Sequence, residues 1–243
     1  MDEEFLDIAR KAAGASEIFH IEDIQTLWSG YGKIMRYGLR GGVCERVVIK
    51  HVKLPDRAHH PRGWDTDRSH QRKIKSYHVE SAWYREWAGL CDGSCRVPYC
   101  HVLEDSDEEF LMVLEDLDAS GFPVRKNAIS IDEMQGCLNW LACFHATFMG
   151  KAPTGFWEVG TYWHLDTRPD ELEALQDDGL KAAAASIDQA LGSARYLTLV
   201  HGDAKLANFC FSESGEQVAA VDFQYVGGGC GMKDVAYFIG SCL

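Results

Sequence analysis

The sequence has no long apolar run and no excess of basic residues. No stretch of the 243 residues approaches the ~20 apolar residues that a membrane-spanning helix needs. The first residues, MDEEFLDIARKAAG, are acidic where a signal peptide is basic. Lysine and arginine number 24 against 37 aspartate and glutamate residues, so the formal net charge is −13. Because nucleic acids bind basic surfaces, this composition predicts a protein with neither a membrane span nor a nucleic-acid partner.

Zinc-type cysteine pairs are also missing. Of nine cysteines, Cys91, Cys95 and Cys100 cluster beside His101, but no two Cys-x2-Cys pairs face each other. We interpret the cysteines as buried or incidental reduced thiols. Together with the acidic N-terminus, they predict a cytoplasmic protein.

The most informative stretch is 198–225, TLVHGDAKLANFCFSESGEQVAAVDFQY. Two apolar, strand-like runs in it are each followed by an aspartate, Asp203 and Asp222, and Asn208 lies between them. Phosphoryl transfer from a nucleotide needs this set: a carboxylate for the hydroxyl proton, then an amide and a second carboxylate for Mg²⁺. A lone His-Gly-Asp is also typical of a capped turn, but Asp203, Asn208 and Asp222 together favour phosphoryl transfer.

A lysine upstream is a further candidate residue of a phosphoryl-transfer site. Residues 47–50, Val-Val-Ile-Lys, form a β-branched run, and a lysine at the end of a buried strand needs a paired charge. The pattern of 76–90 predicts a helix with a broad apolar face, on which Glu80 and Glu86 are candidate partners. Glu80 has an aromatic residue three positions to either side, so we predict that it faces inward and pairs with Lys50. An exposed position on the helix is the alternative for either glutamate.

These motifs resemble those of the protein-kinase-like superfamily. His201-Gly202-Asp203, Asn208 and Asp222-Phe223-Gln224 are similar to its catalytic loop and metal-binding segment. Gly202 and Gln224 stand where protein kinases have arginine and glycine. The small-molecule branch resembles the chain more closely: aminoglycoside phosphotransferases, choline kinases and above all the ecdysteroid-kinase-like (CHK) group.

The resemblance implies a role for each motif. Asp203 would orient or deprotonate the acceptor hydroxyl. Asn208 and Asp222 would hold Mg²⁺. Lys50 and Glu80 would position the phosphates of ATP.

Two further segments receive roles in the same way. Gly30 and Gly32, between the first expected strands, would lie over the phosphates, although a hairpin turn explains this Gly-x-Gly equally well. Backbone groups of the linker residues Glu115, Asp116 and Leu117 would bind adenine.

Basic residues near these motifs have two interpretations each. Lys205 would approach the γ-phosphate, and a solvent-facing lysine is an equal alternative. Residues 54–75 have no apolar period and predict a long loop. Its basic side chains could contact phosphate or substrate, but a solvated loop is preferred; they are Arg57, Arg62, Arg68, Arg72 and Lys73.

The segment after Asp222 also matches the family pattern. A glycine-rich run at 227–231 is followed by Asp234 and Val-Ala-Tyr. We predict that Asp234 caps the last helix and braces the catalytic loop. Ser130 with Glu133 three residues on is a capping-box pattern and predicts the start of a long helix. His145 within this helix is interpreted as packing rather than catalysis.

The expected fold is α+β and bilobal, as in protein kinases. Residues 1–114 form a small antiparallel β-rich lobe, 115–118 a linker, and 119–243 a larger, mostly helical lobe. Relatives usually continue with further helices that help to build the acceptor pocket. Because this chain stops at Leu243, we expect a short or truncated form, or a pocket built in another way. The aromatic segment 156–164 would either line that pocket or seal the core.

The predicted function is transfer of the γ-phosphoryl group of ATP to a hydroxyl group of a small metabolite. The acidic charge is compatible with a cationic acceptor, and the oligomeric state is not indicated. The alternative is a nucleotide-binding pseudokinase or truncated regulatory module without turnover. A protein kinase is disfavoured by Gly202 and by the absence of Ala-Pro-Glu after Asp222.

Overall fold

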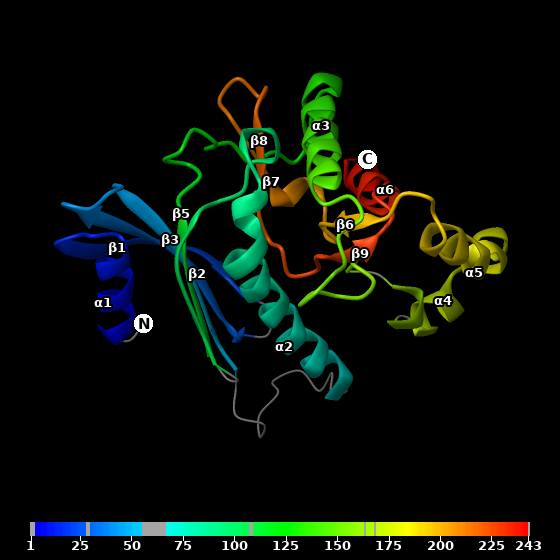
Figure 1. Cartoon of the computed structure of the whole chain (residues 1–243), viewed down its shortest axis with the longest axis horizontal. Coiled ribbons are helices and arrows are strands. Elements are labelled where there is room, and N and C mark those ends of the chain that lie inside the picture. Colours follow the sequence, from blue (N-terminus) through cyan, green and yellow to red (C-terminus); the bar gives the residue numbers. More distant parts are fainter. Residues whose placement is uncertain are drawn as a thin grey trace.

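The structure, a computed structural model, consists of a β-rich region and a helical region that lie side by side (Figure 1). It describes residues 3–27, 30–54, 67–106, 109–162, 164–167 and 169–242, with the backbone only for 67–69 and 167.

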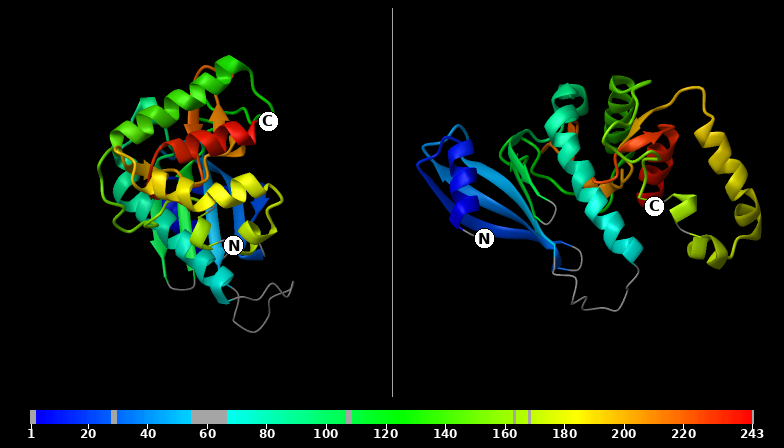
Figure 2. Two further views of the ribbon diagram at one scale, coloured as in Figure 1. Left: turned by 90° about the vertical axis from the view of Figure 1, so that its right-hand side faces the viewer. Right: turned by 60° about the horizontal axis from the view of Figure 1, so that its bottom comes forward.

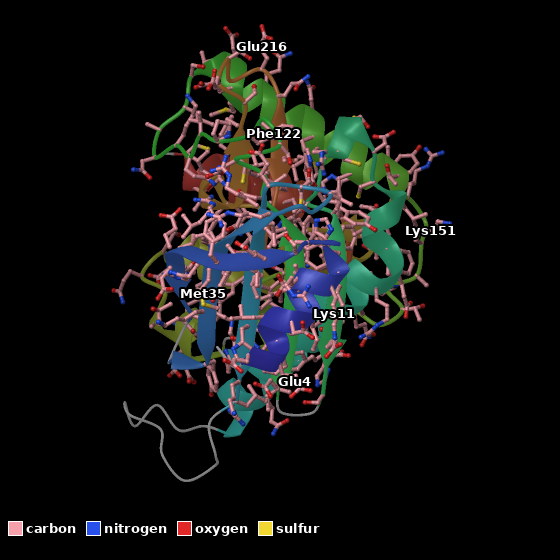
Figure 3. The ribbon with its side chains drawn as sticks, turned by 90° about the vertical axis from the view of Figure 1, so that its left-hand side faces the viewer. Glu4, Lys11, Met35, Phe122, Lys151 and Glu216 are labelled. Carbon is pink, nitrogen blue, oxygen red and sulfur yellow. The ribbon has the colours of Figure 1, made fainter. Side chains whose placement is uncertain are left out.

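Five antiparallel strands form the β-rich region, in the spatial order β1-β2-β3-β5-β4. They are β1 (Glu17–Thr26), β2 (Gly32–Arg40), β3 (Arg46–Lys53), β4 (Cys100–Asp105) and β5 (Glu109–Glu115). Helix α1 (Glu3–Ala12) covers the face of this sheet that is turned away from the helical region (Figures 1 and 3). The sheet confirms the five-stranded antiparallel region predicted from the sequence.

Strand β3 presents two different faces because its side chains alternate. Ile49 is fully buried in the core beneath α1. Val48 and Lys50 lie on the opposite face, toward the helical region. The register places Arg36 of β2 beside Val48 and Ile34 beside Lys50, so all four side chains line the same space between the two regions.

Helix α2 (Asp67–Ala82) runs between the sheet and the helical region (Figure 1). It continues as a π-helical turn, η2 (Trp83–Trp87), and a 3-10 turn, η3 (Ala88–Leu90). Trp83 is fully buried and stacks on Phe223, with ring centroids 4.4 Å apart. The end of α2 is therefore packed into the core of the helical region.

The predicted loop over 54–75 is wrong for its last part, because α2 already begins at Asp67. The first seven residues of α2, DRSHQRK, include no apolar residue, so the sequence shows no apolar period there. Residues 55–66 lie outside the described residues.

The helical region combines four helices with two small sheets, in which β6 pairs with β9 and β7 with β8. The helices are α3 (Ile131–Thr147), α4 (Pro169–Ala174), α5 (Asp178–Gly192) and α6 (Met232–Ser241), and the short turns are η4 (Gly93–Cys95), η5 (Leu165–Thr167) and η6 (Leu206–Asn208). The strands are β6 (Thr198–Val200), β7 (Phe209–Phe211), β8 (Val218–Ala220) and β9 (Gly227–Gly229). Helix α5 stands at the end farthest from the five-stranded sheet (Figure 2).

Candidate active site

A cavity of about 550 Å³ lies between the two regions. Strands β2 and β3, helix α2, the linker after β5 and the segment after β8 all contribute to its walls. It brings together residues that are far apart in the sequence, including Lys50, Glu80, Asn208 and Asp222.

Lys50 and Glu80 form a buried ion pair on this wall. The Nζ of Lys50 lies 2.8 Å from Oε1 and 2.6 Å from Oε2 of Glu80, and the two residues are 5% and 1% exposed. Burial raises the pKa of Glu80, and the charge of Lys50 opposes that rise. Glu86 is exposed on the π-helical turn. Of the two candidate glutamates, the fold therefore brings Glu80 to Lys50.

The catalytic-loop motif follows directly after β6. Gly202 has a φ of +80°, and a Cβ there would lie 2.0 Å from the carbonyl oxygen of Tyr225. A side chain at this position would therefore collide with the backbone, which accounts for glycine where protein kinases have arginine.

Asp203 is 3% exposed, and its two carboxylate oxygens differ in their hydrogen bonding. Oδ2 accepts hydrogen bonds from Lys205 Nζ at 2.9 Å and from Asn208 Nδ2 at 3.1 Å. Burial alone would lower the pKa of Lys205, but the bond to Asp203 and the negative charges around it raise that pKa above its ordinary value. Oδ1 is buried and has no hydrogen-bond partner within the described part of the chain.

Asp222 adopts a left-handed backbone conformation, with φ of 68°. Such strain at a non-glycine residue persists only where the surroundings enforce it, and it is typical of functional sites. The amide of Val221 donates to the carbonyl oxygen of Asn208 at 3.0 Å, which holds the two segments together. Asp222 Oδ1 lies 3.9 Å from Lys50 Nζ and accepts no hydrogen bond from the described residues.

The partnerless oxygen of Asp222, with the side-chain oxygen of Asn208 in the same cavity, fits a hard divalent cation such as Mg²⁺, which prefers oxygen ligands. Within the described ranges, no group of three or more histidine, cysteine, aspartate or glutamate residues is arranged so that it could hold a metal ion by itself. This small donor set suits Mg²⁺, which usually takes one or two carboxylates and completes its shell with phosphates and water.

Asp234 braces the catalytic loop. Its carboxylate accepts the backbone N–H groups of His201 at 2.7 Å and Gly202 at 2.9 Å. His145 Nε2 lies 2.8 Å from Oδ2 of the same carboxylate, so His145 is part of this network as well as of the packing. The predicted bracing is confirmed. The predicted helix cap is wrong, because α6 begins after Gly231 and Asp234 lies inside its first turn.

The sequence analysis did not predict two contacts of the site. The first is between Lys73 and Gln224. Lys73 Nζ donates to Gln224 Oε1 at 2.7 Å, and Ser76 Oγ donates to the same oxygen at 3.3 Å. The available signal was spacing, because Lys73 precedes Glu80 by seven residues and two helical turns place both on one face.

The second contact involves Arg36 and the linker. Arg36 Nε lies 2.8 Å from Oδ2 of Asp116, which is 1% exposed, and Arg36 Nη2 lies 2.5 Å from Oδ2 of Asp118. Glu115, Asp116 and Leu117 all line the cavity, as an adenine-binding linker would. The carboxylate of Asp116 is occupied by the arginine.

Gly30 and Gly32 are not among the residues that line the cavity. A Cβ on Gly32 would lie 2.0 Å from the carbonyl oxygen of His51, so strand packing already explains that glycine. Trp28 and Ser29, which precede Gly30, lie outside the described residues.

One ring of the aromatic segment has the predicted core role, and two others pack on Tyr225. Phe156 is buried in the core against Trp83. Trp157 stacks at 6.2 Å and Tyr162 packs edge-on at 5.0 Å against Tyr225, next to the catalytic loop. The remaining large ring, Trp163, lies outside the described residues.

The geometry is that of a kinase-like phosphotransferase fold, and sequence comparison agrees. The sequence profile of the Phosphotransferase enzyme family (APH) matches residues 71–242, more than half of the chain, and the chain therefore belongs to this family. No curated protein sequence matches it significantly.

Solved structures resemble this chain at low sequence identity. Aminoglycoside phosphotransferase APH(3'')-Id from Streptomyces rimosus, in complex with ADP and streptomycin, is 13% identical with a TM-score of 0.51, over 98% of this chain and 82% of that one. A putative fructosamine-3-kinase from Haemophilus somnus is 12% identical with a TM-score of 0.48, over 95% and 74%. None of the helices described for this chain has the length and apolar character needed to cross a bilayer.

Proposed function

We propose that this chain is a kinase that transfers the γ-phosphoryl group of ATP, with Mg²⁺, to a hydroxyl group of a small molecule. The observation that carries the proposal is the set of two partnerless carboxylate oxygens, on Asp203 and Asp222, and the buried Lys50–Glu80 pair. Asp222, Lys50 and Glu80 line the cavity, and Asp203 adjoins it through its hydrogen bond from Asn208, which also lines it. Residues 1–114 would form the nucleotide-binding lobe, 115–118 the linker and 119–243 the catalytic lobe.

Asp203 would act on the acceptor through Oδ1. Lys205 and Asn208 already hold Oδ2, so the carboxylate is fixed and its other oxygen is left to accept the hydroxyl proton. As the acceptor oxygen bonds to the γ-phosphorus, the bond from that phosphorus to the bridging oxygen breaks and ADP leaves. Bound Mg²⁺ would neutralise phosphate charge during this step.

Lys50 would contact the phosphates, and Asn208 and Asp222 would hold the metal. Placement and charge neutralisation supply most of the rate in such reactions, because the protein forms no covalent intermediate. We infer that the acceptor enters beside Tyr162, whose backbone N–H donates to the carbonyl oxygen of Gly202 at 2.6 Å. A hydroxylated, cationic acceptor would suit the aromatic rings there.

A screen of hydroxylated metabolites for Mg·ATP-dependent ADP release tests this proposal. We expect at least one acceptor to stimulate ADP release in the parent protein and not in Asp203→Asn. Binding of Mg·ATP without release for any acceptor would favour the pseudokinase instead. Failure to bind Mg·ATP would refute the assignment.

A further inference from the structure

Lys73 is a second lysine on the cavity wall, and it differs from Lys50 and Lys205 in the partner of its ammonium group. Lys50 is neutralised by Glu80 and Lys205 by Asp203. Lys73 Nζ instead contacts the neutral amide oxygen of Gln224 and lies 4.9 Å from the ring centroid of Tyr77. Among the described residues, no carboxylate oxygen lies within ion-pair distance of it.

This arrangement leaves the ammonium group of Lys73 without a carboxylate in contact among the described residues. Burying a charge without an opposite charge is costly, and a bound anion would relieve that cost. Burial and the nearby charge of Lys50 lower the pKa of Lys73 to about 8, whereas Asp222, Glu80 and Asp203 oppose this shift. The environment is therefore one in which an anionic ligand stabilises the protonated lysine.

Gln224 fixes where this charge points. The residue is 3% exposed, and its carbonyl oxygen on the backbone accepts a hydrogen bond from Trp157 Nε1 at 2.8 Å. Its side-chain oxygen holds Lys73 and Ser76 of α2. Because Gln224 follows Asp222 by two positions, the ammonium group of Lys73 is tied to the segment that carries Asp222. Glycine at this position would have no side chain to make the link.

We propose that Lys73 is a second phosphate-binding lysine, which contacts the terminal phosphates of a nucleoside triphosphate in this cavity, and that Gln224 is its positioning residue. The inference rests on the proposed function. An ammonium group is a compact point charge suited to phosphate oxygens. Together with Lys50 it would place two ammonium groups at the phosphate end of the site, where negative charge must be stabilised during transfer.

Calorimetric titration of ATP, ADP and AMP with Mg²⁺ tests the proposal on Lys73→Met. We expect its Kd for ATP to rise at least tenfold, its Kd for ADP to rise less, and its Kd for AMP to stay within twofold of the parent. Lys73→Arg should recover most of the ATP affinity. Lys75→Met is the matched control: Lys75 is exposed, lies outside the cavity lining and holds its ammonium 4.4 Å from the ring centroid of Trp157.

The outcomes separate this inference from the proposed function. The inference is wrong if the parent binds ATP and Lys73→Met binds it equally well. It is also wrong if Lys73→Met loses affinity for ATP and AMP in equal measure, because Lys73 then only links α2 to the segment that carries Gln224. If the parent binds no nucleotide, both proposals fail.

A measurement that needs no variant is acylation of the parent by an amine-reactive ester, mapped by mass spectrometry. ATP should protect Lys73 and AMP should not; equal labelling in both would contradict the proposal.

Discussion

The Lys50–Glu80 pair makes a quantitative prediction about stability. Both residues are almost fully buried, so removing one leaves the other as an uncompensated charge. Breaking a buried pair in this way costs about 3–5 kcal/mol of unfolding free energy. We expect Lys50→Met and Glu80→Gln each to show a loss of this order. The double variant buries no charge and should lose no more than either single variant.

The single and double variants should therefore be strongly non-additive. Adding the two single losses would overestimate the loss in the double variant by about 3 kcal/mol, the upper end of the range for contacting residues. Urea unfolding followed by tryptophan fluorescence measures these free energies, and Glu86→Gln, at an exposed position on the same helical segment, is the control. Additive losses would show that the ion pair contributes little.

The same variants should differ in their pH dependence. Burial raises the pKa of Glu80 above its ordinary 4.5, and without Lys50 the opposing charge is gone. A group with a raised pKa in the folded state contributes stability below its unfolded pKa and loses it as pH rises through the folded value. Lys50→Met should therefore lose stability as pH rises above about 4.5, until Glu80 is ionised. The double variant should lack this dependence. If the free energy of unfolding of Lys50→Met and that of the double variant changed with pH in the same way, the reasoning would be refuted.

Three substitutions test the catalytic loop and the metal segment. Asp203→Asn removes the proton acceptor but keeps the shape, so turnover should fall at least ~10²-fold while the Kd for Mg·ATP stays near that of the parent; full turnover would exclude Asp203 as the base. Asp222→Ala removes a hard-oxygen ligand, so Mg²⁺ should no longer add to the rise in melting temperature caused by ATP; an unchanged rise would contradict the assignment. Asp234→Ala leaves the buried N–H groups of His201 and Gly202 without their acceptor, at about 1–3 kcal/mol each, so thermal unfolding should occur at a lower temperature. An unchanged melting temperature would show that other groups brace the loop.

Local patterns in the sequence were sufficient for much of the fold. A lysine at the end of an apolar strand predicted a charge that needs a partner, and the helical position of Glu80 predicted which glutamate faces inward. The packing of the two elements then brought the charges together. The capping-box pattern at Ser130 and Glu133 likewise predicted the start of α3 correctly, because a cap depends on residues three positions apart.

Contacts between distant segments could not be predicted in this way. Lys73 and Gln224 are 151 positions apart, and Arg36 and Asp116 are 80 apart. Their side chains are polar and have no period that distinguishes a buried cavity wall from a solvated surface. The start of α2 was missed for a similar reason, since its first seven residues are all polar or charged and lack the apolar stripe by which helices are recognised.

The left-handed backbone at Asp222 sets a limit on engineering this protein for thermostability. Glycine adopts this conformation without the steric cost, roughly 1–2 kcal/mol, that a side chain incurs. A selection for heat resistance alone would therefore favour Asp222→Gly and remove the carboxylate that faces Lys50. Libraries designed to stabilise the chain should keep position 222 constant and direct substitutions to surfaces remote from the cavity, where stability and activity do not compete.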